Sequence, residues 1–177
     1  MIFNKTKIKG LYVIEPEPKV DERGNFVRIF CKKELEREGL IFDIAQINRS
    51  LTRKKGTIRG MHFQKKPKAE AKIVQCLKGA IYDVAVDLRK NSSTYGQWAG
   101  EELTEDNGKM FFLPKGFAHG FQALTDNCNV QYFMSEFYAP ELSNGVRFND
   151  PFLNIKWPIK NPIVSEKDKN WPLIKSR

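Results

Sequence analysis

The residues with the clearest potential for chemistry lie in the stretch TIRGMHFQ, at positions 57–64. His62 is one of only 2 histidines in the chain, and it follows Arg59 among apolar neighbours. Histidine changes its protonation near neutral pH, so His62 could act as a base, bind a metal or simply pack in the core. Arginine adds a forked cation that suits phosphate. For a lone histidine on a strand the packing role is the commonest, and these residues alone leave all three roles open.

The second histidine, His119, lies in the stretch PKGFAHG at positions 114–120. Its P-x-G-x-x-H spacing resembles the second signature of cupins, which are small jelly-roll barrels. The first cupin signature, G-x5-H-x-H, is matched from Gly56 onward, except that Gln64 replaces its second histidine. Metal-binding cupins use several histidines and a glutamate, so a metal site here would lack its usual imidazole ligands. We therefore expect no metal.

Arg59 and His62 fall on one predicted strand. In a regular strand, residues three apart point to opposite faces, which would separate the two side chains. Gly60 lies between them and allows a β-bulge that would re-aim one of them. An inward histidine beside an inward arginine would suit an anionic substrate held near a base.

The elements that must position these residues are mostly short strands. Period-two patterns and turn residues predict strands over Leu11–Ile14, Phe26–Phe30, Phe42–Arg49, Thr57–Gln64, Lys72–Leu77, Ile81–Leu88, Gln97–Leu103, Met110–Leu113, Phe121–Leu124 and Val130–Phe137. Lys32–Glu38 is predicted to be a helix that Gly39 ends. This pattern indicates an antiparallel sandwich or barrel, for which a jelly roll fits the length; a mixed α+β domain is the alternative.

Size and composition limit the class of protein. The 177 residues and 20.5 kDa suit one domain, which we expect to span residues 1–177. No apolar run approaches the roughly 18 residues that cross a membrane, and the N-terminal MIFNKTKIKG lacks the apolar core of a secretory signal. The 3 widely spaced cysteines suit a reducing compartment, so we expect a cytoplasmic protein.

The net charge of +9 favours an anionic partner, either nucleic acid or a phosphorylated small molecule. The basic residues are scattered along the chain, and no zinc-finger spacing, RNP motif or recognition-helix pattern accompanies them. The charge by itself therefore leaves the class of partner open.

TIRGMHFQ resembles the R-G-L-H-Y/F-Q signature of the dTDP-4-dehydrorhamnose 3,5-epimerases, cupin-fold enzymes that act on a nucleotide-linked 4-keto-6-deoxy sugar. The resemblance extends along nearly the whole chain, and so many ordered matches are more specific than any single motif. The other matching segments are DERGNF (21–26), QINRS (46–50), KIV (72–74), GAIYDVAVDLR (79–89), YGQW (95–98), PKGFAHGF (114–121), YFMSEFYAP (132–140), VRFNDP (146–151), WP (157–158) and SEKD (165–168).

The resemblance implies an all-β fold, a cupin-type antiparallel jelly-roll barrel with short peripheral helices. It also implies a metal-free isomerase that inverts C3 and C5 of dTDP-4-dehydro-6-deoxyglucose through enolates. The protons on those carbons are acidic because each carbon lies next to the C4 ketone. The reaction therefore needs a base, a group that holds the enolate oxygen and an acid, and no cofactor is expected.

Four residues match the catalytic positions of the family. His62 resembles the base, and Asp168 resembles the carboxylate that orients it. Lys72 resembles the cation beside the enolate, and Tyr132 the acid on the opposite side. Without the resemblance, Tyr132 could be a barrel aromatic, Lys72 a solvated edge charge and Asp168 part of a polar tail.

The resemblance also implies a nucleotide-diphosphate 4-keto sugar as partner, with no nucleic acid and no membrane, and a homodimer with exchanged N-terminal strands. Arg23 and Phe26 would then serve the site of the partner subunit. The implied substrate contacts are Arg23 and Arg59 at the diphosphate, Gln46 and Asn48 at the nucleotide and phosphate, Tyr138 stacked on the base, Phe26, and His119 and Lys167 near the substrate.

Three positions differ from the family pattern: Arg28 and Ser143 stand where glutamates are common, and Phe133 replaces a common lysine. Arg28 puts a cation where the family holds thymine, so the nucleotide stays open. One alternative is an epimerase that acts at only C3 or C5, or on another nucleotide-linked 4-keto sugar. Further alternatives are a cupin sugar 3,4-ketoisomerase and a non-catalytic nucleotide or nucleic-acid binder.

Overall fold

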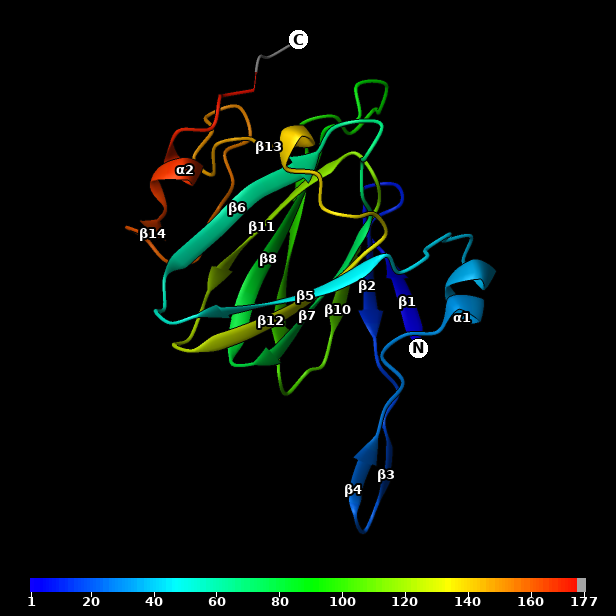
Figure 1. Cartoon of the computed structure of the whole chain (residues 1–177). Coiled ribbons are helices and arrows are strands. Elements are labelled where there is room, and N and C mark those ends of the chain that lie inside the picture. The colour runs from blue at the N-terminus through cyan, green and yellow to red at the C-terminus, as the bar shows by residue number, and fades with distance from the viewer. Residues whose placement is uncertain (175–177) are drawn as a thin grey trace.

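Two β-sheets face each other in the computed structural model, which describes residues 1–174 (Figure 1). The first sheet contains, in spatial order, β1 (Ile2–Lys5), β2 (Tyr12–Glu15), β10 (Met110–Leu113), β7 (Lys72–Lys78), β12 (Cys128–Met134) and β5 (Gln46–Thr52). The second contains β13 (Ser143–Gly145), β6 (Thr57–Gln64), β11 (Phe117–Ala123), β8 (Ala80–Asp87) and β9 (Trp98–Thr104), and β14 (Ile163–Val164) pairs with β6. Neighbouring strands in both sheets are antiparallel, except that β14 is parallel to β6.

The helical elements are short and lie at the periphery. They are α1 (Lys32–Arg37), the 3-10 helix η1 (Pro140–Leu142) and α2 (Glu166–Lys169). None of the helices within residues 1–174 is long and apolar enough to span a membrane. The expected all-β, antiparallel architecture with short peripheral helices is therefore confirmed.

Apolar side chains fill the space between the sheets, because alternate residues of each strand face inward. Val74 and Phe111 of the first sheet meet Ile81 and Phe121 of the second in one buried cluster. A second cluster contains Leu35 of α1 and residues of the first sheet. The two clusters bury both faces of the first sheet at its centre and leave the polar side chains near β5 and β6 to line a cavity.

Four predicted strands are wrong in extent. The predicted strand Phe121–Leu124 omits the first half of β11, which begins at Phe117, and the predicted strand Val130–Phe137 continues past the end of β12 at Met134. The predicted strand Phe26–Phe30 continues β4 (Gly24–Phe26) too far, and the predicted strand Phe42–Arg49 starts before β5 begins at Gln46. Phe30 and Phe42 lie in loops, and Phe30 packs against Phe42 and against Phe133 of β12. Their apolar character therefore reflects burial by side-chain packing rather than strand pairing.

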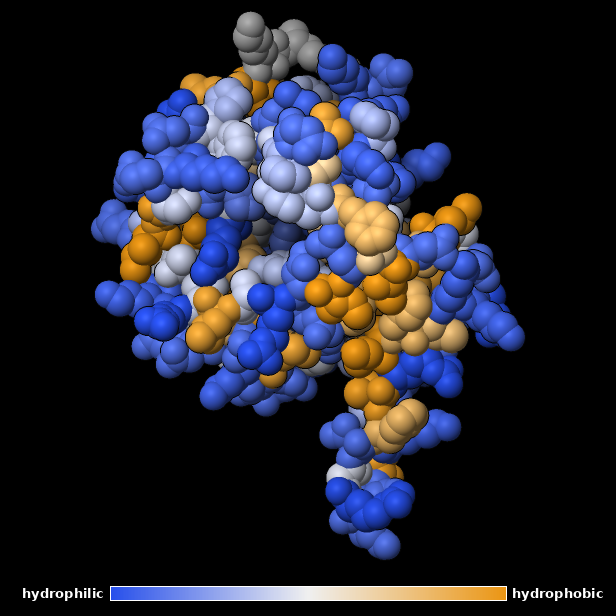
Figure 2. Space-filling view, in the orientation of Figure 1, coloured by the Kyte–Doolittle hydropathy of each residue, from blue (hydrophilic) through white to orange (hydrophobic). Residues whose placement is uncertain are grey.

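A hairpin of β3 (Lys19–Asp21) and β4 projects away from the two sheets (Figure 1). It carries Val20 and Phe26, which are 76% and 70% exposed. Figure 2 shows apolar side chains on this projection, between hydrophilic ones. Large apolar side chains gathered on a projecting element are typical of a contact surface.

Candidate active site

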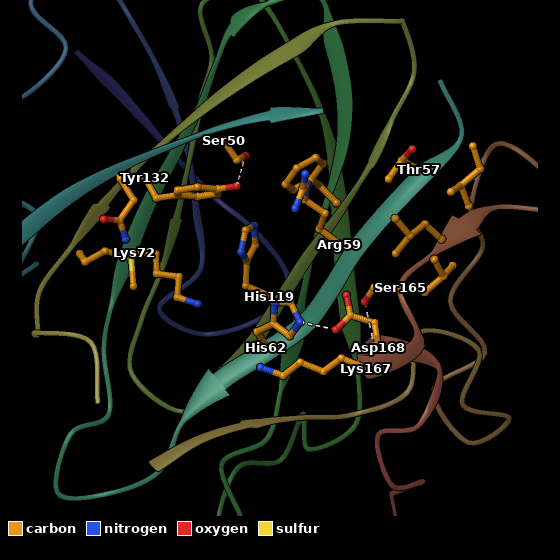
Figure 3. A pocket seen from close by; sticks show the side chains of 16 residues that line it. Ser50, Thr57, Arg59, His62, Lys72, His119, Tyr132, Ser165, Lys167 and Asp168 are labelled. Atoms are coloured by element: carbon orange, nitrogen blue, oxygen red, sulfur yellow. Dashed lines mark hydrogen bonds and ion pairs between the residues drawn. The ribbon is translucent and has the colours of Figure 1, made fainter. Parts of the chain in front are cut away.

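A cavity of about 620 Å³ lies between the edge of the first sheet, strands β6 and β11 of the second, and the C-terminal segment β14–α2 (Figure 3). Its lining brings together residues from distant parts of the chain. The lining residues are Asn48, Ser50, Thr57, Ile58, Arg59, His62, Lys72, His119, Phe121, Tyr132, Met134, Ile163, Val164, Ser165, Lys167 and Asp168.

A β-bulge at Gly60 lets Arg59 and His62 line the same cavity. His62 pairs with His119 and Arg59 pairs with Phe121, so β6 has one more residue than β11 across this interval. Gly60 has a φ of +137°, and a Cβ atom there would lie only 2.5 Å from the Cα atom of Gly120. The bulge that Gly60 allows is therefore present, and glycine is required because the two strands approach each other so closely.

His62 and Asp168 form a hydrogen-bonded pair at the edge of the cavity. The Nε2 atom of His62 lies 2.6 Å from Oδ1 of Asp168, whose side chain is 6% exposed. Burial favours a higher pKa for Asp168, but its hydrogen bond and charge interaction with His62 outweigh this and lower the pKa below its ordinary value. The carboxylate is therefore kept ionised, as required to orient His62 and stabilise its protonated form.

Two further groups fix the carboxylate of Asp168. The backbone N–H of Gly60 donates to Oδ2 at 3.2 Å, and the indole N–H of Trp171 donates to Oδ1 at 3.1 Å. Ser165 caps the short helix α2 by accepting a hydrogen bond from the backbone N–H of Asp168. These hydrogen bonds hold Asp168 in place beside His62.

Lys72 enters the cavity from the central strand β7. Its side chain is 10% exposed, and its Nζ atom lies 3.0 Å from Oε1 of Glu70. The other Glu70 oxygen accepts the backbone N–H of Gln64. The alternative of a solvated edge charge is wrong, because the ammonium group is held in a largely dry position where it acts strongly on nearby charge.

Tyr132 faces the cavity from β12, on the side opposite the His62–Asp168 pair (Figure 3). Its hydroxyl lies 2.6 Å from Oγ of Ser50 on β5. Burial, partly offset by the hydrogen bond with Ser50, raises the pKa of Tyr132 to about 12. At neutral pH Tyr132 is therefore protonated and can supply a proton.

His119 lies beside His62 on the neighbouring strand and pairs with a buried carboxylate. Its Nε2 atom lies 2.7 Å from Oδ1 of Asp83, whose side chain is fully buried. Burial raises the pKa of Asp83 although the charge and hydrogen bond of His119 oppose the rise. Both histidines of the cavity lining therefore pair with a carboxylate: His62 with Asp168, which also lines the cavity, and His119 with the buried Asp83.

The binding residues predicted at the diphosphate and base divide between two cavities. Arg59 is held by Thr52, which accepts from its Nε atom at 3.0 Å, and it lines the main cavity with Asn48. Gln46 does not line that cavity; it links Asn48 at 3.2 Å to the backbone N–H of Tyr138 at 2.8 Å. Tyr138 lies at the neighbouring cavity of about 190 Å³.

This neighbouring cavity continues the main one, because His62, Lys72, Met134 and Lys167 line both. Lys167 also lies over the ring of Trp171, with its Nζ atom 5.4 Å from the ring centroid. Except for Gln46, the predicted site residues from β5, β6, β7, β11, β12 and α2 are thus brought to one connected space.

Arg23 and Phe26 are not brought to this space within one chain. Both lie on the projecting hairpin, where the Arg23 side chain is 85% exposed and pairs with Asp21 at 2.6 Å. Of the three positions that differ from the family pattern, Ser143 lines the smaller cavity. Arg28 pairs with Glu34 at 2.9 Å away from both cavities, and Phe133 is buried against Phe30.

Sequence reasoning missed four residues that support the site: Ser50, Glu70, Asp83 and Trp171. Asp83 had a signal, because a charged residue within an apolar strand needs a buried partner. Ser50 had another, since it lies two residues after Asn48 and therefore on the same face of β5. Within residues 1–174, no group of three or more His, Cys, Asp or Glu side chains is arranged to hold a metal ion.

A jelly-roll barrel whose mouth holds a His–Asp pair, a buried lysine and a protonated tyrosine defines a cupin-type enzyme of acid–base chemistry. The family model described as dTDP-4-dehydrorhamnose 3,5-epimerase matches residues 5–176. The chain belongs to this family of isomerases.

Individual relatives agree with the family. A dTDP-4-dehydrorhamnose 3,5-epimerase of Methanothermobacter thermautotrophicus is 46% identical over 172 residues, which cover 96% of this chain and 92% of the relative. The crystal structure of such an enzyme from Bacillus anthracis, with TDP and PPi bound, has a TM-score of 0.95 and 44% identity, and covers 98% of this chain and 99% of that one. A dTDP-4-dehydrorhamnose 3-epimerase of Streptomyces niveus is 38% identical over 168 residues, which cover 94% of this chain and 81% of that relative. The cupin-type fold is thereby confirmed.

Proposed function

We propose that the chain epimerises C3 and C5 of dTDP-4-dehydro-6-deoxyglucose by proton transfer through enolates. The main support for this proposal is the position of the acid and base groups in the main cavity. The general base His62, with its partner Asp168, lines one side of the cavity, and the acid Tyr132 lines the opposite side. Lys72 also lines this cavity. Inversion of a carbon needs removal of a proton from one face and delivery to the other, and this arrangement provides both.

Each group has one task in the proposed reaction. His62 removes the proton from the carbon next to the ketone, and Asp168 stabilises the imidazolium that forms. Lys72 stabilises the negative charge that develops on the ketone oxygen, which is most effective in a site that excludes water. Tyr132 then donates its proton to the opposite face of the carbon. General acid–base groups of this kind typically contribute ~10²–10⁴-fold each to the rate.

The nucleotide part is proposed to lie toward Arg59 and the smaller cavity. The guanidinium group of Arg59, held by Thr52 and by the backbone carbonyl of Leu51, suits the diphosphate. Asn48 would contact the same region, and Tyr138 would stack on the base. The binding of TDP and PPi by the Bacillus anthracis relative supports a dTDP-linked substrate.

Isotope exchange tests the reaction class. In D2O, the enzyme with dTDP-4-dehydro-6-deoxyglucose is expected to give product labelled at both C3 and C5. Label at C3 alone would favour a 3-epimerase, the second candidate, which the Streptomyces niveus relative supports. Product with a moved carbonyl would favour the 3,4-ketoisomerase, and no label at either carbon would refute epimerisation.

A panel of dTDP, GDP, CDP and UDP tests the nucleotide. A ligand that binds the folded state raises the unfolding temperature by mass action, so dTDP is expected to give the largest rise. A larger rise with another nucleotide would reassign the substrate. Tight binding of duplex DNA at physiological salt without binding of dTDP would favour the nucleic-acid alternative instead.

The chain is further proposed to act as a homodimer in which Arg23 and Phe26 complete the partner's site. The exposure of Val20 and Phe26 on the projecting hairpin supports this proposal. A mixture of the inactive His62→Ala and Arg23→Ala variants, refolded together, is expected to regain activity, because each mixed dimer holds one intact site. If light scattering shows dimers but activity is not restored, Arg23 does not contribute to the partner's site.

The single domain over residues 1–177 and the cytoplasmic location stay predictions. Residues 175–177 of that domain lie outside the described residues. Limited proteolysis that yields one resistant core, and fractionation of cells, would check the two predictions.

A further inference from the structure

Ser50 lies within hydrogen-bonding distance of Tyr132, the residue proposed as the acid of the reaction. Tyr132 of β12 pairs with Asn48 of β5, so Ser50 is its diagonal neighbour on the same face of the first sheet. The long tyrosine side chain reaches Ser50, and their oxygen atoms are 2.6 Å apart. Both residues line the main cavity, and Ser50 is only half-buried.

The proposed reaction creates a proton imbalance. When His62 removes a proton from carbon and Tyr132 breaks its O–H bond to form the new C–H bond, His62 is left protonated and Tyr132 is left as a tyrosinate. A second inversion cannot begin until one proton has moved from His62 to Tyr132. The same reset is needed between turnovers even if only one carbon is inverted.

The tyrosinate in this position is a strong base that needs a hydrogen-bond donor. Burial, together with the negative charge of Asp83, raises the pKa of Tyr132 to about 12, although the hydrogen bond with Ser50 and the positive charge of Arg59 oppose the rise. Either oxygen of the Ser50–Tyr132 pair can be the donor at rest. Once Tyr132 is ionised, Ser50 must be the donor, because a tyrosinate has no proton to give.

Other polar groups near Tyr132 are engaged elsewhere. His119 meets the tyrosine ring at a centroid distance of 6.1 Å in a T-shaped contact, and its Nε2 atom is paired with Asp83. The ammonium group of Lys72 pairs with Glu70, and Arg59 donates to Thr52 and to the carbonyl of Leu51. Ser50 is thus the group that combines an O–H within bonding distance of Tyr132 with partial exposure to the cavity.

We propose that Ser50 is the positioning residue through which Tyr132 regains its proton after each inversion. The Ser50 hydroxyl passes its proton to the tyrosinate and takes one from a water molecule in the cavity. The hydroxide that remains takes the proton that His62 releases, so one proton moves in total from the imidazolium to the tyrosinate. This inference rests on the proposed epimerase function.

A matched pair of variants tests the inference. Ser50→Thr keeps the hydroxyl, and Ser50→Val has nearly the same shape without it. With dTDP-4-dehydro-6-deoxyglucose, Ser50→Val is expected to slow turnover at least about tenfold. This is less than the ~10²–10⁴-fold typical of a general acid or base, because Tyr132 itself is still present. Product inverted at only one carbon should accumulate, and Ser50→Thr should retain most of the wild-type rate.

The dependence on buffer separates proton return from simple orientation of Tyr132. At constant pH and ionic strength, the rate of Ser50→Val should rise with the concentration of imidazole buffer, which can supply the missing proton, whereas the wild type should not respond. Ser50→Ala provides the same test if Ser50→Val does not fold. A variant as fast as wild type, or a loss that ignores buffer, would overturn the inference.

The outcomes are distinguishable from failure of the proposed function. Wild-type enzyme that places no deuterium on either carbon in D2O refutes the epimerase proposal itself. Wild-type enzyme that labels the substrate, combined with buffer-independent Ser50 variants, refutes only the role of Ser50.

Discussion

Replacement of Asp168 by asparagine tests the central pair of the site. The Asp168→Asn variant keeps the shape of the side chain but removes the charge that faces Nε2 of His62 at 2.6 Å. A hydrogen bond to a charged group contributes ~1.5–3 kcal/mol. Because the imidazolium forms during proton removal, this loss falls on the transition state, and it corresponds to a decrease in kcat of about 10- to 150-fold.

The assay is turnover of dTDP-4-dehydro-6-deoxyglucose under saturating substrate, with dTDP binding measured in parallel by thermal shift. Binding should change little, because the carboxylate of Asp168 is bonded to His62, Gly60 and Trp171. Glu166→Gln is the matched control: it removes a charge from the same helix, but its side chain is 80% exposed and pairs with Lys169. This control should keep wild-type turnover.

If Asp168→Asn kept more than half of the wild-type kcat while remaining folded, the carboxylate would not assist His62. If Asp168→Asn and Glu166→Gln lost the same activity, the effect would come from the net charge of the helix rather than from the hydrogen bond.

Three further predictions concern neighbouring features. Gly60→Ala should lower the unfolding temperature by at least about 2 °C, since strain of about 1–3 kcal/mol is expected where the new Cβ would lie 2.5 Å from Gly120. Gly39→Ala, also at positive φ but with open space, should cost less, and equal losses in calorimetry would contradict the steric argument. Asp87, bonded to Arg89, Ser92 and Thr94, has a pKa of about 2, because these hydrogen bonds outweigh the effect of burial. Because its pKa is lower in the folded state than in the unfolded state, ionised Asp87 stabilises the fold by about 2 kcal/mol above about pH 4, and this stability is lost as the pH falls from about 4 to 2. In urea unfolding, Asp87→Asn should therefore be less stable than wild type at pH 7, with a difference that narrows toward pH 2. A difference that stays constant with pH would contradict this role of Asp87. Trp171→Phe keeps the ring beside His62 but removes the donor to Asp168, so kcat should fall severalfold with unchanged KM, and a change in KM alone would show that Trp171 acts in binding.

Local sequence patterns determined much of the fold. The strands Thr57–Gln64 and Met110–Leu113 have the predicted bounds, because their apolar residues and flanking turns are local properties. The histidine count and the ordered motifs likewise indicated the cupin-type family before any contact was known. The strand ends near Phe30 and Phe42 were wrong because an apolar loop residue and an apolar strand residue look alike until their packing partner is known.

The tertiary structure alone decided which side chains meet. His62 and Asp168 are 106 residues apart, and Ser50 and Tyr132 are 82 apart, so no local pattern could pair them. Their contacts depend on the register between strands and on one additional residue in β6 at Gly60, which turns Arg59 and His62 toward one cavity. The residue types and the fold class thus follow from local sequence patterns, whereas the geometry of the proton transfers depends on strand register, because register is set by pairing between distant segments.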